Sequence, residues 1–268
     1  MNILIVKLGS IGDIVHTLPS LALIRRALPS STISWVVDKK CAEILTGNSM
    51  IDHLIVVAAK DRRHVQAIGE TLLTKRQQIG LLRASSFDLA IDFQGLLKSS
   101  FIARLSGAQK RFGFARRSLR EPLSALFLTR TFDVPLDSHV IYKNLSLATQ
   151  SLGLAPAPAP DQLEFPVQLD GVHKQEAECA ITRSASSGFS SEFVILNPGG
   201  GWYTKLWSPE RYGKLADEIW NTFQMRSIIT YGPQELSLAE AIESSSVTQS
   251  AKGAELSLKG FCALAKKA

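Results

Sequence analysis

The chain has 268 residues, 45% hydrophobic and 20% charged, with a net charge of +6 and a pI near 9.3. This length suits one large or two modest domains. No apolar run is long enough to span a membrane, and the N-terminus lacks signal-peptide features. Cys41, Cys179 and Cys262 lie far apart, which argues against a disulfide framework or zinc site and favours a reducing, cytoplasmic setting. The positive charge indicates an acidic partner. Charge alone leaves three classes of partner open: nucleic acid, anionic lipid and phosphorylated small molecules.

The first eighteen residues predict a strand, a glycine turn and the start of a helix. Residues 2–8 are mostly apolar, Gly9 and Gly12 allow a sharp turn, and Asp13 follows. This order places a ligand crevice at the carboxyl edge of a parallel sheet. The turn lacks the full G-x-G-x-x-G fingerprint, so it is weak support for a dinucleotide site. Asp13 is either the N-cap of the helix or a general base at the crevice mouth.

The next segments alternate between helix and strand. The pattern predicts a helix over 19–28, with strands over 33–37, 54–57 and 88–93. Such βαβ alternation is typical of a parallel sheet covered by helices on both faces. The first part of the chain is therefore an α/β domain.

Two stretches of this first part are strongly basic. Residues 60–83 form an amphipathic segment whose charges are typical of a solvated helix face. Residues 98–120 carry seven Lys and Arg and no acidic residue. Lys98 falls in the first turn of a helix, where the dipole opposes a cation, so we expect an anion to hold it. Few aromatics and no nucleic-acid motif accompany the stretch, which favours phosphate recognition.

A proline-rich segment divides the chain. Residues 154–166 contain four prolines and predict an extended linker between domains 1–153 and 167–268. A second α/β unit begins with a strand over 193–197, followed by three glycines and Lys205. The glycine run is either a flexible loop or a phosphate cradle. Its place between a strand and a helix that begins at Pro209 favours the cradle.

Three of these segments resemble one known family. The motifs are KLGSIGDIVHTLP at 7–19, DFQGLLKS at 92–99 and NPGGGWYTKLWSPERY at 197–212. They are similar to motifs of the lipopolysaccharide heptosyltransferases, glycosyltransferase family 9, and the resemblance runs to about residue 264. It implies a GT-B fold of two Rossmann-like α/β domains with parallel sheets, the first binding the acceptor and the second the donor. The opening motif and REPL at 120–123 resemble the first heptosyltransferase of core assembly more than the second or third.

The resemblance also implies a reaction and its residues. The reaction is inverting transfer of a heptose from ADP-heptose to a Kdo sugar of the lipopolysaccharide inner core, with Asp13 as catalytic base. Lys205 matches a lysine that meets the diphosphate, and Glu235 matches a glutamate near the ribose, although charge stabilisation of a helix start explains Glu235 equally well. The implied donor residues are Gly12, Gly200, Gly201, Thr204, Lys205 and Glu235. The implied acceptor residues are Arg62, Arg63, Gln94, Lys98 and Arg120.

No cofactor or metal is expected, because the sequence has no D-x-D motif and no His/Cys cluster. The expected partners are ADP-heptose, a Kdo-lipid A type acceptor and an anionic membrane surface, without nucleic acid. The expected location is the cytoplasmic face of the bacterial inner membrane, with peripheral attachment.

Family members continue into a D-x-G-x-x-H loop that nothing after Glu255 supplies, so we expect an incomplete second domain. Two alternatives stay open. One is a non-catalytic fragment that binds acidic lipid, and the other is a different nucleotide-sugar enzyme such as an epimerase.

Overall fold

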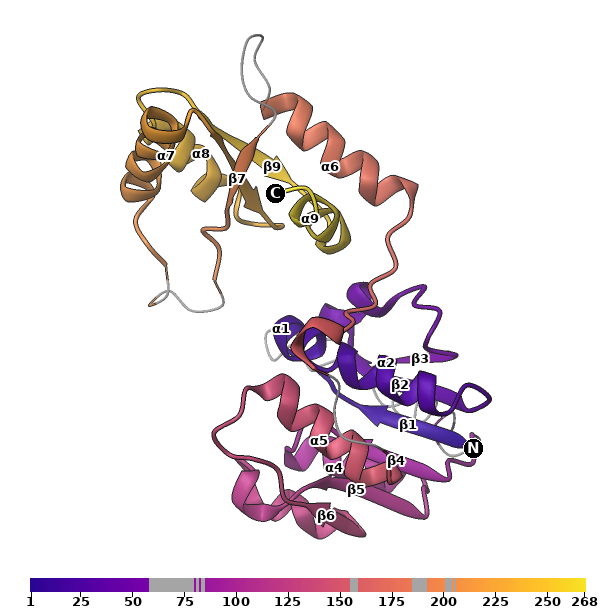
Figure 1. Cartoon of the computed structure of the whole chain (residues 1–268). Helices are drawn as coiled ribbons and strands as arrows, with labels where there is room; N and C mark the ends of the chain where they lie inside the picture. Colours follow the sequence, from indigo (N-terminus) through magenta and orange to yellow (C-terminus); the bar gives the residue numbers. More distant parts are fainter. Residues whose placement is uncertain are drawn as a thin grey trace, which may run out of the picture. The chain divides into compact units, whose positions relative to one another are not determined.

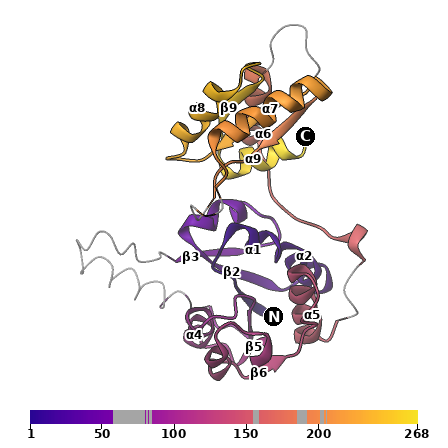
Figure 2. The ribbon, with the colours of Figure 1, turned by 90° about the vertical axis from the view of Figure 1, so that its left-hand side faces the viewer.

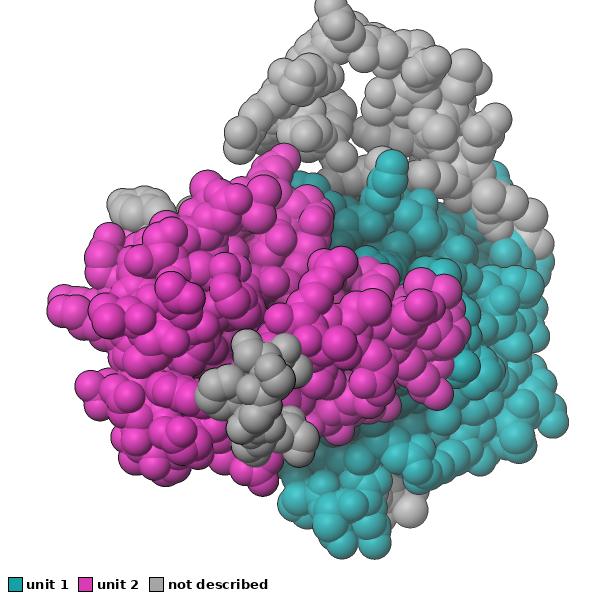
Figure 3. All heavy atoms as spheres, turned by 90° about the horizontal axis from the view of Figure 1, so that it is seen from above, with its two compact units in different colours: residues 1–168 teal, residues 169–268 magenta. Residues whose placement is uncertain are grey.

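The computed structural model describes residues 1–57, 80, 82, 85–154, 159–184, 192–200, 204 and 206–268. The chain divides into two compact units, residues 1–168 and 169–268 (Figure 3). The division lies just beyond the predicted linker. The described end of that linker belongs to the first unit, where the side-chain amide of Asn48 donates a 2.7 Å hydrogen bond to the carbonyl of Pro166.

The first unit is built on a six-stranded sheet of the order β3-β2-β1-β4-β5-β6 (Figure 1). All neighbouring strands are parallel, as the βαβ pattern predicts. The strands are β1 (Asn2–Val6), β2 (Thr32–Asp38), β3 (His53–Val57), β4 (Leu89–Asp92), β5 (Lys110–Phe114) and β6 (Arg130–Phe132). The chain order reverses between β1 and β4, and ligands of open α/β sheets bind at the carboxyl edge of such a switch point.

Helices cover both faces of this sheet. The α-helices are α1 (Ile11–Val15), α2 (Leu18–Ala27), α4 (Leu97–Leu105) and α5 (Val140–Leu152). The 3₁₀-helices are η1 (Lys39–Leu45), η2 (Arg116–Ser118), η3 (Pro122–Phe127) and η4 (Pro160–Gln162). Helix α4 lies on one face, and α2 packs with α5 on the other (Figure 2). After the glycine turn the segment forms two helices, and α2 begins at Leu18, one residue before the predicted helix over 19–28.

The core of the first unit follows the alternation of the strands. Leu4 and Val6 lie in a buried cluster with Ala103 of α4. Ile3 and Ile5 are also fully buried and point to the opposite face, since successive side chains of a strand alternate. A strand that is apolar on both faces is expected in a sheet sandwiched between helix layers. The parallel pairing of β1 with β4, in which Val6 lies opposite Asp92, places the carboxyl ends of the two strands side by side.

The second unit has a three-stranded parallel sheet of the order β7-β8-β9 in its described residues. Its strands are β7 (Phe193–Leu196), β8 (Arg226–Tyr231) and β9 (Ala251–Glu255), and its helices are α6 (Gly171–Ser184), α7 (Pro209–Phe223), α8 (Leu236–Ser245) and α9 (Leu258–Ala265). Ile228 packs in a cluster with α6 and α9, whereas Ile229 packs in a cluster with α7 and α8. Helix α7 begins at Pro209 after its N-cap Ser208, as predicted. No helix in the described parts of either unit is long and apolar enough to cross a membrane.

Candidate active site

Asp13 lies at the carboxyl end of β1, in the short helix α1. It is the third residue of that helix, and Ser10 is the N-cap. The backbone N–H of Ser10 donates to Oδ2 of Asp13 at 3.2 Å, and the Ser10 hydroxyl lies 3.4 Å from the same oxygen. The interpretation of Asp13 as the N-cap is therefore wrong, because its side chain reaches back to the cap residue as in a capping box. The carboxylate is half-buried and reachable from solvent.

The glycines of the opening motif do not act through a left-handed backbone, although the peptide bond between Gly9 and Ser10 is cis. Neither Gly9 nor Gly12 has a positive φ, so the predicted reliance of the turn on glycine freedom is corrected. A Cβ on Gly9 would lie 3.3 Å from Sγ of Cys41. A Cβ on Gly12 would meet no atom of the described residues within 4 Å. Gly12 thus leaves open space beside Asp13 that a ligand can use.

Asp92 anchors the turn after β4 from inside the protein. It is fully buried and accepts hydrogen bonds from the backbone N–H of Gln94 at 2.9 Å and of Gly95 at 3.1 Å. The hydroxyl of Ser99 in α4 donates to its second oxygen at 2.9 Å. Burial raises the pKa of the Asp92 carboxyl to about 6, against the lowering effect of these hydrogen bonds. The turn is therefore held by a single buried carboxyl group.

Gln94 links the turn after β4 to the turn after β1. Its Oε1 accepts from the backbone N–H groups of Leu8 at 3.1 Å and Gly9 at 3.3 Å. The next residue, Gly95, has φ +69°, and a Cβ there would lie 2.7 Å from a methyl group of Leu119. These contacts hold the segment that leads into Asp13. Gln94 therefore supports the site, whatever else it contacts.

A pocket of about 210 Å³ lies at this edge of the first unit. It brings together two of the predicted acceptor residues, Gln94 and Arg120. Lys7, Lys143 and Asn144 also line it. Arg120 is exposed, and no ion pair joins it to a described residue. Cationic and amide side chains thus line one small cavity.

Lys98 lies outside this cavity's lining, at the second position of α4. Its Nζ is 3.9 Å from Oδ2 of Asp38 at the end of β2, so Asp38 is an anion near the lysine. Arg117 pairs with Asp133 at 2.7 Å. Part of the charge of the basic stretch over 98–120 is therefore met by carboxylates from elsewhere in the unit. These carboxylates lie outside the basic stretch in the sequence, so the local pattern does not predict the ion pairs.

The second unit presents its own turn cluster at the carboxyl ends of β7 and β8. Glu235 Oε2 accepts from the N–H of Gly232 at 2.9 Å. A Cβ on Gly199 would lie 2.5 Å from Oε1 of Glu235, so the carboxylate lies against the glycine run. Gly200 of that run and Thr204, which follows it, are exposed. The remaining predicted site residues, Arg62, Arg63, Gly201 and Lys205, lie outside the described residues.

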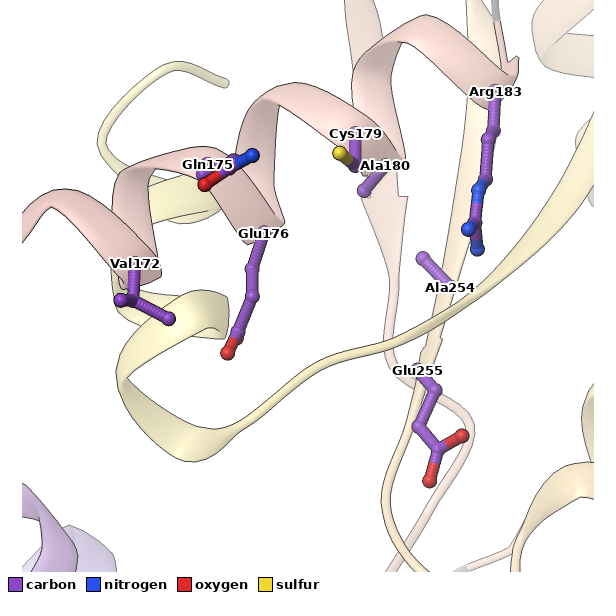
Figure 4. Close-up of a pocket in the computed structure, with 8 residues that line it drawn as sticks. All are labelled: Val172, Gln175, Glu176, Cys179, Ala180, Arg183, Ala254 and Glu255. Carbon is purple, nitrogen blue, oxygen red and sulfur yellow. The ribbon is translucent and has the colours of Figure 1, made fainter.

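A larger pocket, of about 310 Å³, contains none of the predicted site residues. Side chains of helix α6, among them Glu176, Cys179 and Arg183, line it opposite the end of β9 (Figure 4). Glu176 is already engaged, because its Oε2 accepts from the N–H of Ser257 at 3.1 Å and from its hydroxyl at 2.6 Å. The described residues contain no group of three side chains suited to hold a metal ion.

Sequence reasoning missed three residues at the first unit's edge. Glu121 accepts from the N–H of Leu97 at 2.7 Å and so caps α4 beside Arg120. Lys7 and Lys143 line the 210 Å³ pocket. Lys7 had a signal, since it is the one charged residue in the apolar run 2–8. A charge inside a buried strand run is rare without a reason.

The profile of glycosyltransferase family 9 (heptosyltransferase) matches residues 76–268. The chain belongs to glycosyltransferase family 9. Among curated proteins, this family 9 chain is 31% identical over 221 residues to lipopolysaccharide heptosyltransferase 1 of Pseudomonas aeruginosa. The matched region covers 82% of this chain and 58% of that protein. It is 32% identical over 154 residues to lipopolysaccharide heptosyltransferase 1 of Escherichia coli K12, and this match covers 57% of this chain and 48% of that protein. The matches thus span about half the length of these relatives.

Solved structures agree on the fold of this family 9 protein. The E. coli heptosyltransferase WaaC, solved with ADP-2-deoxy-2-fluoro heptose, matches with a TM-score of 0.76 and 25% identity, over 98% of this chain and 79% of that one. A family 9 glycosyltransferase from Veillonella parvula matches with a TM-score of 0.77 and 19% identity, over 98% and 72%. The family resemblance and the GT-B type α/β fold class are confirmed.

Proposed function

We propose that this family 9 protein takes part in inverting transfer of a heptose from ADP-heptose to a Kdo sugar of the lipopolysaccharide inner core. The names of its curated relatives and the ADP-heptose analogue of the E. coli structure support this. The observation that carries the proposal is Asp13, a half-buried carboxylate next to Gly12 at the switch point of the first sheet. A carboxylate in such a place is suited to proton abstraction.

Asp13 would act as the general base. A sugar hydroxyl is a poor nucleophile at neutral pH, so its proton must leave as the oxygen attacks the anomeric carbon. The new C–O bond forms on the face opposite the departing diphosphate, which inverts the centre. The hydrogen bonds from Ser10 to the Asp13 carboxylate end on Oδ2. Oδ1 is therefore the oxygen that would accept the proton, and Ser10 would hold the carboxylate in one orientation.

The donor would bind to the second unit. Gly200, Gly201 and Thr204 would direct backbone N–H groups at the diphosphate, and Lys205 would meet its growing negative charge. With a lysine in that role the reaction needs no metal or other cofactor. Glu235, which lies against the same glycine run, would accept hydrogen bonds from the ribose hydroxyls. Gly12 would let the reacting sugar approach Asp13.

The acceptor would bind to the first unit. Its anionic groups would meet Arg120 and Gln94 in the pocket, Lys98 at the start of α4, and Arg62 and Arg63. The basic surface would also let a cytoplasmic protein rest on the anionic face of the inner membrane without spanning it. Nucleic acid has no part in this proposal.

The test measures transfer and donor binding in the 268-residue protein. ADP, titrated by calorimetry, should bind saturably and raise the melting temperature. Asp13→Asn should lower transfer to a Kdo-lipid A acceptor at least 100-fold while ADP affinity stays unchanged, since general-base catalysis contributes about 10² to 10⁴ in rate. Asp137→Asn, at an exposed carboxylate of the same unit, is the matched control.

Three results would contradict the proposal. Transfer by Asp13→Asn within tenfold of wild type would remove Asp13 from proton transfer. Conversion of the sugar nucleotide without acceptor would indicate an epimerase-like enzyme. Lipid binding without ADP binding or transfer would indicate a non-catalytic protein.

A further inference from the structure

Asp92 and Ser99 form a buried cluster in which one hydroxyl hydrogen faces two acceptors. Both residues are fully buried. The hydroxyl oxygen of Ser99 lies 2.9 Å from Oδ2 of Asp92 and 2.8 Å from the carbonyl oxygen of Leu96. The backbone N–H of Leu96 donates to the same hydroxyl at 3.0 Å. Because a hydroxyl carries a single hydrogen, Ser99 can donate to Asp92 or to Leu96 but not to both at once.

One added proton matches every donor of this cluster to an acceptor. A protonated Asp92 donates from Oδ2 to the Ser99 hydroxyl, which then donates to the Leu96 carbonyl. When Asp92 loses the proton, the hydroxyl donates to Oδ2, and the Leu96 carbonyl still accepts from the N–H of Ser100 at 3.0 Å. The geometry thus accommodates both states of the carboxyl group. Burial raises the pKa of Asp92 to about 6, so the cluster changes state close to neutral pH.

The elements packed against Asp92 bring few charges to it. Among the described residues, the charged group that acts on Asp92 is Lys7 of β1, which favours the ionised form. Strand β5 places the uncharged Gly113 opposite Asp92. The charges at the start of α4 are engaged elsewhere, since Lys98 lies near a carboxylate of β2 and Glu121 accepts from a backbone N–H. Titration of the cluster is therefore governed by its own hydrogen bonds, by burial and by Lys7.

A series of hydrogen bonds leads from this cluster to the proposed base. Oδ1 of Asp92 accepts from the N–H of Gln94, and Oε1 of Gln94 accepts from the N–H of Gly9 at 3.3 Å. Ser10, the next residue, donates to Oδ2 of Asp13. An ionised carboxylate accepts shorter and stronger hydrogen bonds than a neutral carboxyl group. Ionisation of Asp92 therefore tightens the turn from which this series starts.

We propose that Asp92 is a positioning residue for Asp13, and that ionisation of this buried carboxyl group fixes the two turns that hold the base. Ser99 stabilises the ionised form by donating to Oδ2. The charge lowers the stability of the fold because it is buried, while it strengthens the local N–H contacts of the turn. The role of Asp13 as base rests on the proposed function, whereas the proton of the cluster does not depend on any substrate.

The first experiment measures kcat of transfer by the 268-residue protein between pH 5 and pH 8. In the wild type, kcat should fall as the pH drops through about 6. Asp92→Asn stays neutral, so it should lower kcat at least tenfold at pH 8 but less than threefold at pH 5. Ser99→Ala removes the donor to the carboxylate and should move the fall in kcat upward by at least half a pH unit. Ser100→Ala, at the neighbouring buried serine of α4 whose hydroxyl donates to backbone carbonyls, is the matched control and should leave the profile unchanged.

The second experiment needs no substrate. The N–H signals of Gly9 and Ser10, followed by ¹H–¹⁵N NMR over the same pH range, should titrate in the wild type and not in Asp92→Asn. Imidazole groups also change charge in this range, and His16 lies in ring contact with His139 between α1 and the start of α5. Both histidines remain in Asp92→Asn, so a titration that persists in this variant belongs to them and overturns the proposal.

The outcomes separate a positioning role from a structural one. A kcat that Asp92→Asn lowers by the same factor at every pH would overturn the proposal, as would an unshifted profile in Ser99→Ala. Should Asp92→Asn lose its thermal unfolding transition, Ser99→Ala provides the same test through the shift alone. A wild type without transfer, whose Gly9 and Ser10 signals titrate with Asp92, supports the positioning role and counts against the proposed function alone.

Discussion

The carboxylate of Glu235 occupies the position that a Cβ atom on Gly199 would take. A Cβ on Gly199 would be 2.5 Å from Oε1 and 2.8 Å from Oε2 of Glu235. The same carboxylate accepts from the N–H of Gly232. Glu235 therefore connects the turn after β7 with the turn after β8. A side chain on Gly199 would therefore displace the Glu235 carboxylate from this position.

Gly199→Ala should displace Glu235 and weaken ADP binding. The new methyl group cannot share the space of the carboxylate, so the hydrogen bond to Gly232 breaks or the glycine run moves. We expect at least a tenfold loss of ADP affinity by calorimetry and little loss of stability, because the displaced atoms are the far end of the flexible Glu235 side chain. Gly171→Ala is the control, since a Cβ there meets no described atom within 4 Å. Unchanged ADP affinity in Gly199→Ala would contradict the placement of Glu235 in the donor site.

Gly12→Ala should lower transfer activity without lowering the stability of the folded protein. Gly12 lies inside α1, without a positive φ and without described neighbours that a Cβ would meet. Alanine should leave stability unchanged or raise it by up to about 1 kcal/mol, because it is the better helix former. Transfer should nevertheless fall, since the methyl group enters the space next to Asp13. Chemical denaturation checks the predicted stability, and a transfer assay on the same sample checks the predicted loss of activity. Full activity would mean that no ligand approaches Gly12.

Asp92→Asn should change how stability depends on pH. The folded protein holds the Asp92 proton more tightly than the unfolded chain, with a pKa of about 6 against 3.8. The contribution of Asp92 is therefore fully present below pH 3.8 and is lost as the pH rises through about 6. A pKa difference of about two units between the folded and unfolded states corresponds to about 3 kcal/mol in the free energy of unfolding.

The measurement is urea denaturation of wild type and Asp92→Asn at several pH values between 4 and 7. The difference between the two proteins should shift in favour of the variant as the pH rises, since asparagine stays neutral. Comparison with the variant cancels the opposite effect of Asp52 and Asp217, whose pKa values are lowered in the folded protein. A pH-independent difference would mean that Asp92 titrates alike in both states.

Gly95→Ala and Gly107→Ala form a matched pair. Both glycines have a left-handed backbone, with φ +69° and +76°. Only at Gly95 would the added Cβ meet a neighbour, Leu119, at 2.7 Å. Gly107→Ala should cost about 1–2 kcal/mol for the backbone conformation. Gly95→Ala should cost about 1–3 kcal/mol more for overpacking, and equal losses in thermal unfolding would show that Leu119 moves aside freely.

Local sequence determined the order of the elements and much of the site. The apolar runs before Gly9, Gln94 and Pro198 predict buried strands, because strand length and apolar character are properties of adjacent residues. The motif residues follow those strands, so their place at the carboxyl edges of two parallel sheets was also predictable. The family was readable from the same motifs, since each is a contiguous stretch of the chain.

Tertiary structure decided which of these residues have partners and what surrounds them. Lys98 meets Asp38, Glu235 meets Gly199, and Lys7 lies beside the carbonyl of Phe93. Each pair is separated by tens of residues, and nothing in the local pattern selects one partner over another. The N-cap interpretation of Asp13 failed for a related reason, because the side chain of a helix-start aspartate can serve the helix from more than one position. Sequence patterns specify elements through neighbours in the chain, whereas burial, pairing and cavity shape arise when distant segments pack.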